Sequence, residues 1–273
     1  MCLVILGHRA CSEYPLIVAA NRDEFYARKT EASTFWPQHP NLLAGRDLEQ
    51  GGTWMGVTRC GRFAAITNFR DPAATAMAPR SRGELPLQYL VGNMTAGAFL
   101  NRIAERSSLY AGFNLLLGDR EEMWYFSNSP RQTNGEPAGG SPEPPRILAP
   151  GIYGLSNALL DTPWPKVERG KQGLTRALQA PVDHDTLMHL IDDRHLADRN
   201  ARTAFDISED MDYLLSAQFI VTDTYGTRSS TTLWSGRDGR VNWRELSFDQ
   251  HGIIRTTREE NFCLHTNESL GHL

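Results

Sequence analysis

Residues 16–24 read LIVAANRDE, five apolar side chains followed directly by four polar ones. A second apolar run, residues 3–6, precedes this stretch across a polar turn. Short apolar runs joined by a polar turn are typical of a hairpin whose strands are largely buried. If Leu3 pairs with Ala19 or a near neighbour, the hairpin brings the start of the chain to residues 21–24, here called the NRDE segment. We therefore expect Cys2 to lie beside this segment.

The rest of the chain predicts further hairpins, with helices inserted in blocks. We expect strands at residues 53–57, 63–68, 113–118, 122–127, 151–156, 218–222, 228–235 and 240–246, and a glycine-rich bend at residues 45–52. We expect helices at residues 84–91, 95–106, from 163 or 165 to about 178, and 183–191, with Thr95, Thr162 and Asp183 as N-caps. This order favours antiparallel sheets covered by helices, and without a linker or an internal repeat residues 1–273 are expected to form a single domain.

The composition excludes several classes of function. The 273 residues carry a net charge of −4 with both signs interspersed, and no basic stripe suggests nucleic acid as a partner. No apolar run reaches the roughly 18 residues of a membrane span, and the first run is too short for a signal peptide. The four cysteines form no CxxC pair and the eight histidines show no metal-ligand spacing, so neither disulfides nor a zinc site are indicated. We expect a soluble, cytoplasmic protein that takes a small-molecule ligand or substrate.

Cys2 is the residue on which the predicted chemistry depends. If Met1 is removed, Cys2 carries a thiol and a free α-amino group, a nucleophile and a general base in one residue. A thiol has a pKa of about 8.5 and an α-amino group one of about 7.7–8.0, so the amine can take the thiol proton near neutral pH. A retained Met1 acylates the amine and blocks this chemistry. The alternative is that Cys2 is a small buried cysteine that opens an edge strand.

Polar residues at the ends of predicted strands are candidates for the rest of the site. Arg22 can stabilise a thiolate, and Asp23 can hold an ammonium group. Asn68 and Asn157 can each donate an amide N–H to a developing oxyanion, and Arg228 can bind an anionic substrate group. Each has an alternative: a solvated turn for the NRDE segment, turn or capping positions for the asparagines, and an exposed strand position for Arg228.

Several segments, taken together, resemble one family. They are Cys2 and the stretches AANRDEF at residues 19–25, GGTWMG at 51–56, AITN at 65–68, GFNL at 112–115, GLSNALLDTPW at 154–164 and YGTR at 225–228. On these motifs, in order along most of the chain, the sequence resembles the NRDE family, also called the transport-and-Golgi-organisation protein two family. That family is similar to N-terminal-nucleophile hydrolases. The resemblance therefore implies an α+β fold, a four-layer αββα sandwich of two antiparallel sheets between helix layers.

The resemblance also implies roles for individual residues. The enzymatic relatives are the choloylglycine hydrolase and penicillin acylase group, which cleave amides with an N-terminal cysteine. By that likeness Cys2 is the nucleophile, Asp23 orients its amine, and Asn68 and Asn157 contact the oxyanion or the amine. Arg228 resembles a site arginine.

Asn21 and Arg22 are expected to contact the substrate together with Arg228. The similar hydrolases carry Arg-Asn-x-Asp at the end of the second strand, whereas this chain has Ala20 in place of the arginine. We expect Arg22 to compensate only if the backbone turns.

Two functions are therefore predicted. The first is a hydrolase in which Cys2 attacks an amide or related acyl bond of a small molecule, with no cofactor. The alternative is a non-catalytic protein that binds and carries haem or a lipid such as acyl-CoA in the same cleft, because the family is also associated with haem trafficking and lipid homeostasis. Five aromatic residues either line such a pocket or belong to the core: Trp36, Trp54, Phe69, Trp124 and Trp164.

Overall fold

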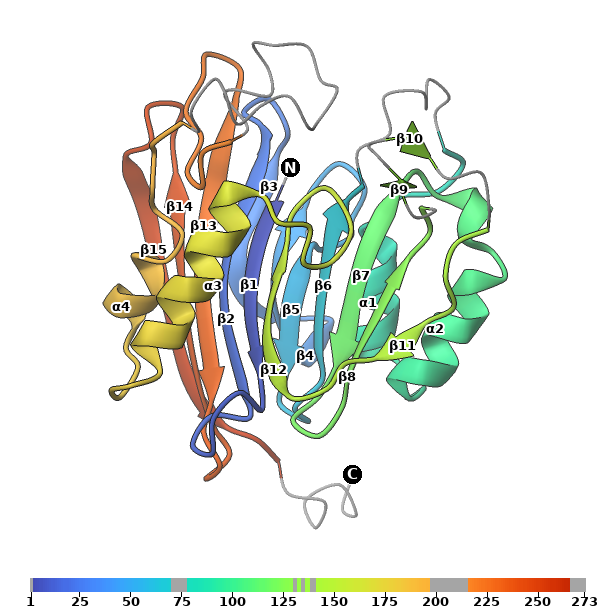
Figure 1. Cartoon of the computed structure of the whole chain (residues 1–273), viewed down its shortest axis with the longest axis horizontal. Coiled ribbons are helices and arrows are strands. Elements are labelled where there is room, and N and C mark those ends of the chain that lie inside the picture. Colours follow the sequence, from blue (N-terminus) through green and yellow to red (C-terminus); the bar gives the residue numbers. More distant parts are fainter. Residues whose placement is uncertain are drawn as a thin grey trace.

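The computed structural model of this protein describes residues 2–69, 78–129, 132–133, 136–137, 141–196 and 216–265. In this part of the chain most strands belong to two antiparallel sheets, which lie face to face (Figure 1). The first sheet has the strand order β12 (Gly151–Leu155), β1 (Cys2–His8), β2 (Leu16–Phe25), β13 (Tyr225–Ser235), β14 (Arg240–Phe248), β15 (Ile254–Cys263). The N-terminal hairpin β1–β2 therefore lies within this sheet, with a strand on either side.

The second sheet contains the middle of the chain. Its strand order is β11 (Arg146–Ile147), β8 (Met123–Ser127), β7 (Phe113–Gly118), β6 (Phe63–Asn68), β5 (Met55–Thr58), β4 (His39–Asp47), β3 (Thr30–Trp36). A separate ribbon pairs β9 (Gln132–Thr133) with β10 (Glu136–Pro137). The described helices are α1 (Glu84–Val91), α2 (Ala96–Ala104), the 3-10 turn η1 (Ser107–Leu109), α3 (Pro165–Ala177) and α4 (His184–Met188).

Three apolar clusters define the layers. One fills the space between the sheets, the second packs α1 and α2 against the outer face of the second sheet, and the third packs α3 and α4 against the outer face of the first. Figure 1 shows the same arrangement, with α3 and α4 over one sheet and α1 and α2 over the other. The predicted α+β fold, a four-layer αββα sandwich, is confirmed.

The continuous apolar runs of β1 and β2 follow from their place in the middle of these layers. Leu3 and Ile17 belong to the cluster under α3, whereas Val4 and Val18 belong to the cluster between the sheets. Successive side chains of a strand point to opposite faces, so a strand that is covered on both faces needs apolar residues at every position. This alternation also decides which way each residue of the NRDE segment points.

The sequence-based prediction lacks three of the longer strands, β3, β4 and β15, and also the two-residue strands β9, β10 and β11. Residues 45–52 were expected to form a bend, but Gly45 lies inside β4, which pairs with β3. β15 also went unrecognised, because most of its side chains are exposed, although it pairs with β14 and its Phe262 packs against Phe35. Strands at a sheet edge bury few side chains and so lack the apolar alternation that identifies a strand.

Two local expectations are wrong and two N-caps are confirmed. Residues 218–222 form an isolated bridge at Val221 instead of a strand. Thr162 does not cap α3, because its hydroxyl donates to the carbonyl of Leu159. Thr95 accepts a hydrogen bond from the backbone N–H of Ala98 at 3.4 Å, and Asp183 accepts one from Thr186 at 2.7 Å, so both are N-caps.

Among the described residues, no helix is both long enough and apolar enough to cross a membrane.

Candidate active site

Cys2 is the first residue of β1 and lies directly opposite Arg22 on β2. The same register pairs Leu3 with Asn21, two positions beyond the expected partner Ala19, so the NRDE segment reaches the very start of the strand. The Cys2 side chain is only 8 % exposed, yet it lines a cleft of about 720 Å³ between the two sheets. The thiol is therefore largely buried, but it borders the cleft and is not sealed inside the core. Met1 lies outside the described residues.

Strand alternation separates the NRDE segment into two faces. Ala20 belongs to the cluster between the sheets, so Arg22, two residues later, points the same way and lies beside the thiol. Asn21 and Asp23 point to the other face, toward α3 and the chain around Ile191. The expectation that Arg22 reaches the thiol only through a backbone turn is wrong, because residues two apart in a strand share a face. Arg22 stands beside Cys2 in the regular pairing of β1 with β2.

Asp23 is almost fully buried, at 2 % exposure, and its carboxylate is held by β13. Thr227 donates a hydroxyl hydrogen bond to Asp23 Oδ1 at 2.7 Å, and the Tyr225 hydroxyl donates to the Asp23 carbonyl oxygen at 2.9 Å. Burial raises the pKa of the Asp23 carboxyl, whereas the nearby charges of Lys166 and Arg22 lower it. The carboxylate is thus fixed in position close to the start of β1.

The electrostatics of the thiol combine burial with nearby charges of both signs. Burial raises the pKa of Cys2, and the charge of Asp23 acts in the same direction. The guanidinium of Arg22 and a backbone hydrogen bond at Asp23 lower it. Arg22 therefore favours the thiolate. Its guanidinium supplies near the thiol the positive charge that Ala20 lacks.

A polar chain links Cys2 to both predicted asparagines. Ser156 follows β12 and donates from its hydroxyl to the Cys2 carbonyl at 3.0 Å, while its own carbonyl accepts from Thr67 at 2.7 Å. Asn157 is buried, and its amide donates to the backbone carbonyl of Asn68 at 2.9 Å. Asn68 lines the cleft, whereas Asn157 does not belong to its lining. Asn157 thus fixes the end of β6, from which Asn68 reaches the cavity.

Two of the expected substrate contacts make structural hydrogen bonds. The Asn21 amide is fully buried and donates to the carbonyls of Ile191 and Gln218 at 2.7 and 2.8 Å, outside the lining of the cleft. Arg228 lines the cleft, but its Nη1 donates to three carbonyls, those of Phe25, Tyr26 and Arg28. Arg228 sits at a β-bulge in the pairing of β13 with β2, and this irregularity turns its side chain toward the loop after β2.

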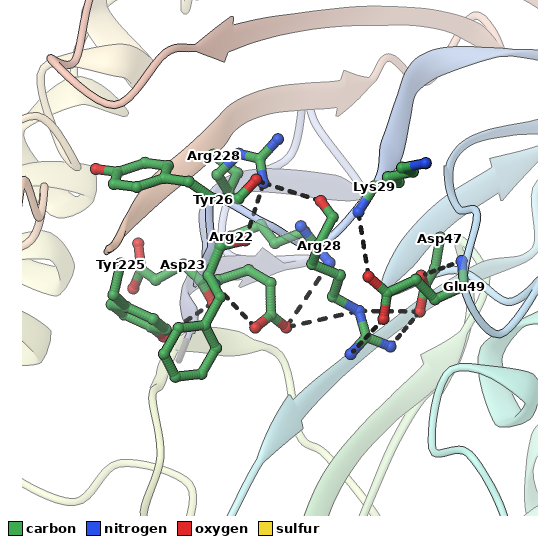
Figure 2. A network of polar contacts seen from close by, with 11 residues as sticks. Arg22, Asp23, Tyr26, Arg28, Lys29, Asp47, Glu49, Tyr225 and Arg228 are labelled. Carbon is green, nitrogen blue, oxygen red and sulfur yellow. Dashed lines mark hydrogen bonds and ion pairs between the residues drawn. The ribbon is translucent and has the colours of Figure 1, made fainter. Parts of the chain in front are cut away.

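The last residue of the NRDE segment connects the two sheets. Glu24 lies 3.8 Å from Arg22 and 4.0 Å from Arg28, and Arg28 pairs with Asp47 of β4 at 2.6 Å (Figure 2). Figure 2 also shows Glu49 beside this group, with its carboxylate 3.9 Å from the Arg28 guanidinium. Arg28 therefore joins the end of β2 to the end of β4 at the cleft.

Lys166 is a buried residue near Asp23 and Cys2 that the sequence analysis missed. It is the second residue of α3, is 1 % exposed, and its ammonium lies 5.3 Å from the centre of the Trp164 ring. Burial lowers its pKa to about 8, while the charges of Asp23 and Cys2 raise it. The sequence did contain a signal, because Lys166 lies one helical turn before Gly170, which packs against Ile5, and so falls on the apolar face of α3.

The cleft is more charged than a pocket for an apolar ligand. Of the five aromatic candidates only Trp54 belongs to its lining, and Trp36 is instead buried in the cluster under α1 and α2. Within the described ranges, no group of three or more histidine, cysteine, aspartate or glutamate side chains is arranged to hold a metal ion. Cys2, Arg22, Asp23, Asn68 and Arg228 all line the cleft, so the structure brings together five of the seven predicted site residues.

Comparisons with known proteins identify relatives over most of the chain. It is 35 % identical over 270 residues to the Transport and Golgi organization protein 2 homolog of Homo sapiens, covering 92 % of this chain and 93 % of the relative. The Drosophila melanogaster protein of that name is 27 % identical over 207 residues, covering 67 % and 68 %.

Among solved structures, the chain is similar to the Caenorhabditis elegans ortholog of N-acylethanolamine-hydrolyzing acid amidase, with a TM-score of 0.48 at 7 % identity, covering 85 % of this chain and 92 % of that one. It is also similar to a mutant conjugated bile acid hydrolase from Clostridium perfringens, with a TM-score of 0.42 at 9 % identity, covering 98 % of each chain. The family model Transport and Golgi organisation 2 matches residues 1–250. The chain belongs to the Transport and Golgi organisation 2 family.

Proposed function

We propose that this protein is an N-terminal-nucleophile hydrolase in which Cys2, exposed by removal of Met1, attacks an amide or related acyl bond of a small molecule. The observation that carries the proposal is the position of Cys2, because it is the one cysteine in the described lining of the cleft and lies opposite Arg22 beside the buried Asp23. Cys2 thus begins a strand, lies beside a charged partner and borders a cavity that can hold a substrate. The bond attacked is a carbon–nitrogen bond outside a peptide.

The reaction follows from the groups around the thiol. With Met1 removed, the α-amino group of Cys2 takes the thiol proton, and Asp23 holds the resulting ammonium. The thiolate, stabilised by Arg22, forms a bond to the carbonyl carbon of the substrate, and the Asn68 amide donates a hydrogen bond to the oxyanion. The ammonium then gives its proton to the leaving nitrogen as the carbon–nitrogen bond breaks. Water, deprotonated by the same amine, hydrolyses the thioester and regenerates the thiol.

Two residues support this reaction from outside the cleft. Asn157 holds the carbonyl of Asn68, and Ser156 holds the carbonyl of Cys2, so the donor and the nucleophile are both fixed to the segment that follows β12. We assign Asn157 a positioning role in place of a direct contact with the oxyanion. Asn21 anchors β2 in the same way on its opposite face.

The rival is a carrier without catalysis that binds haem, a lipid or acyl-CoA in the same cleft. The observation that favours it is the size of the cavity, about 720 Å³, which accommodates a ligand larger than a short amide. No histidine or methionine belongs to the described lining, so Cys2 is the residue there with a sulfur ligand for haem iron. The hydrolase and the haem version of the carrier thus depend on Cys2, but only the hydrolase requires its free amine.

Intact mass spectrometry and thiol labelling separate the two functions. We expect the purified protein to lack Met1 and its Cys2 to react with iodoacetamide at pH 7 faster than the exposed Cys60, despite burial. Peptide mapping locates the label, and Cys2→Ala is the control for assignment. Retention of Met1, or labelling of Cys2 no faster than of Cys60, would contradict the hydrolase. A saturable spectral shift on haemin titration that is lost in Cys2→Ala would then support the carrier.

A further inference from the structure

The cleft that contains Cys2 is lined by an unusual number of arginines. Seven of them belong to its described lining: Arg22, Arg28, Arg46, Arg80, Arg82, Arg228 and Arg255. Five acidic residues belong to the same lining: Asp23, Glu24, Glu31, Asp47 and Glu245. Two of these carboxyl groups, those of Asp23 and Glu245, have a pKa that burial raises, which weakens their negative charge. The cavity therefore carries an excess of positive charge.

Most of these arginines already have strong partners. Arg28 lies 2.6 Å from Asp47, Arg80 lies 2.6 Å from Glu84, and Arg255 lies 2.6 Å from Asp249. Arg228 donates to three backbone carbonyls, as described above. A guanidinium that is paired at this distance gains little by binding a second anion. These four arginines are thus part of the protein's own framework.

Arg22 differs from these four arginines because it has no close partner among the described residues. Its side chain is 11 % exposed, its carboxylate neighbour Glu24 is 3.8 Å away, and its buried Nη1 has no hydrogen-bond partner among the described residues. A buried N–H group without a partner is destabilising, and more so when it carries charge. Arg22 lies opposite Cys2 in the pairing of β1 with β2, and it belongs to the lining of the cleft.

Arg82 approaches the same sulfur from the loop that precedes α1. Its Nη1 donates to the carbonyl of Gly112 at 2.9 Å, and no carboxylate of the described chain lies within ion-pair distance of it. Burial lowers the pKa of Arg82, while the charges of Cys2 and Glu24 raise it, which places its guanidinium within electrostatic reach of both. Two partly buried arginines that have no close carboxylate partner among the described residues therefore line the same cleft as the proposed nucleophile.

We propose that Arg22 and Arg82 bind an oxyanion group, a carboxylate or a phosphate, that the substrate carries next to its scissile amide. That this amide is cleaved rests on the proposed function, whereas the anion site itself is a property of the cleft. The planar fork of a guanidinium matches two oxygens of such a group, and exclusion of water strengthens the bond. The substrate class is then an amide that joins an acyl chain to an anionic amine, such as an N-acyl amino acid.

Binding to the Cys2→Ala variant tests the anion site without any turnover. Calorimetry would compare N-octanoylglycine with N-octanoylglycinamide, which has the same skeleton without the charge, and with N-octanoyl ethanolamine phosphate. We expect at least one of the two anionic compounds to bind about tenfold or more tightly than the neutral amide. The stronger of the two identifies the group as a carboxylate or a phosphate. Raising the salt concentration should reduce this preference.

Substitutions then assign the preference to the two arginines. Arg82→Gln and Arg22→Gln should each remove most of it, and Arg82→Lys should retain part. Arg102→Gln is the matched control, because it removes one positive charge from α2, outside the lining of the cleft. Equal binding of the neutral and anionic compounds would overturn the inference, as would an anion preference that survives both substitutions.

The inference and the proposed function fail in different ways. If the anionic compounds bind preferentially but protein that has Cys2 intact does not cleave them, the anion site stands and the hydrolase fails. If N-octanoylglycinamide is cleaved as efficiently as N-octanoylglycine, the hydrolase stands and the anion site fails. Should Arg82→Gln not fold, protection of Cys2 from iodoacetamide by N-octanoylglycine but not by its amide gives the same answer on unsubstituted protein.

Discussion

The two ends of the space between the sheets differ in what fills them. Reading toward the cleft, the inward side chains are Leu6, Val4 and Cys2 on β1, Val18, Ala20 and Arg22 on β2, and Val241, Trp243 and Glu245 on β14. Each strand keeps its alternation, but where it reaches the cleft its inward side chain changes from apolar to reactive or charged. The same three strands thus provide a core at one end and a candidate site at the other, and a single residue on each marks the boundary.

This comparison predicts that substitutions on the two sides of the boundary have separable effects. A change at the apolar end should lower the free energy of unfolding and leave the chemistry of the folded molecule intact. A change at the charged end should alter the chemistry of the folded molecule and leave the free energy of unfolding nearly unchanged, because charged side chains at a cavity surface contribute little to packing.

Trp243→Ala gives the largest expected effect on stability. The indole is fully buried between the sheets, and its Nε1 donates to the Ser33 hydroxyl at 2.8 Å, so its removal leaves a cavity and breaks this hydrogen bond. We expect a loss of about 3–5 kcal/mol in chemical denaturation. Trp243→Phe should cost less, because it keeps most of the volume. A loss below about 1 kcal/mol would contradict the assignment of this end as the core.

Lys166→Met tests the one buried cation described between the helix layer and the site. Because folding lowers the Lys166 pKa to about 8, the unfolded chain binds the extra proton between pH 8 and the ordinary lysine value of 10.5. In that window the contribution of Lys166 to the free energy of unfolding rises with pH, by at most about 3 kcal/mol. Below pH 8 both states are protonated and the contribution is constant.

The measurement is the difference between unsubstituted protein and Lys166→Met across pH 7–11. That difference should climb with pH in the alkaline range, whereas the same difference for the exposed Lys29→Met should stay flat. A flat curve for both would mean that Lys166 is not buried in solution.

Arg22→Gln gives the smallest of the three expected effects, and the quantity measured is the reactivity of the Cys2 thiol. Removing the guanidinium opposite Cys2 should raise the thiol pKa by about one unit and so slow iodoacetamide labelling at pH 7 about tenfold. The pH profile of labelling should shift to higher pH by the same amount, and Arg22→Lys should recover part of the rate. An unchanged profile would show that Arg22 does not act on the thiol, whatever its effect on folding.

The sequence was sufficient for the architecture and for half of the site. Continuous apolar runs identify buried hairpins such as β1–β2. The prediction of that hairpin was enough to place Cys2 near the NRDE segment. The register could not be read, because apolar runs of equal character pair almost equally well two residues apart. Edge strands such as β15 were invisible for the opposite reason, since exposed side chains carry no periodicity.

The missed features of the site depend on tertiary contacts. Lys166 looks like an ordinary solvated lysine near a helix start until the packing of α3 on β1 is known, although helical spacing from Gly170 does point to it. Asn157 and Arg228 were identified as polar residues near strand ends, but their hydrogen bonds to Asn68 and to the loop after β2 follow only from the fold. Residue type indicated a polar site, and three-dimensional contacts distinguished reacting groups from supports.

The exposed outer strand β15 has one further consequence for the behaviour of this protein at high concentration. An unpaired strand margin is a template onto which another chain can add its own strand, the first step toward aggregates. Along β15 the residues are charged at Arg255, Arg258, Glu259 and Glu260. Pairing of two such edge strands would remove water from these charged side chains. The same exposed, charged residues that made β15 hard to recognise therefore disfavour association of two molecules through this edge.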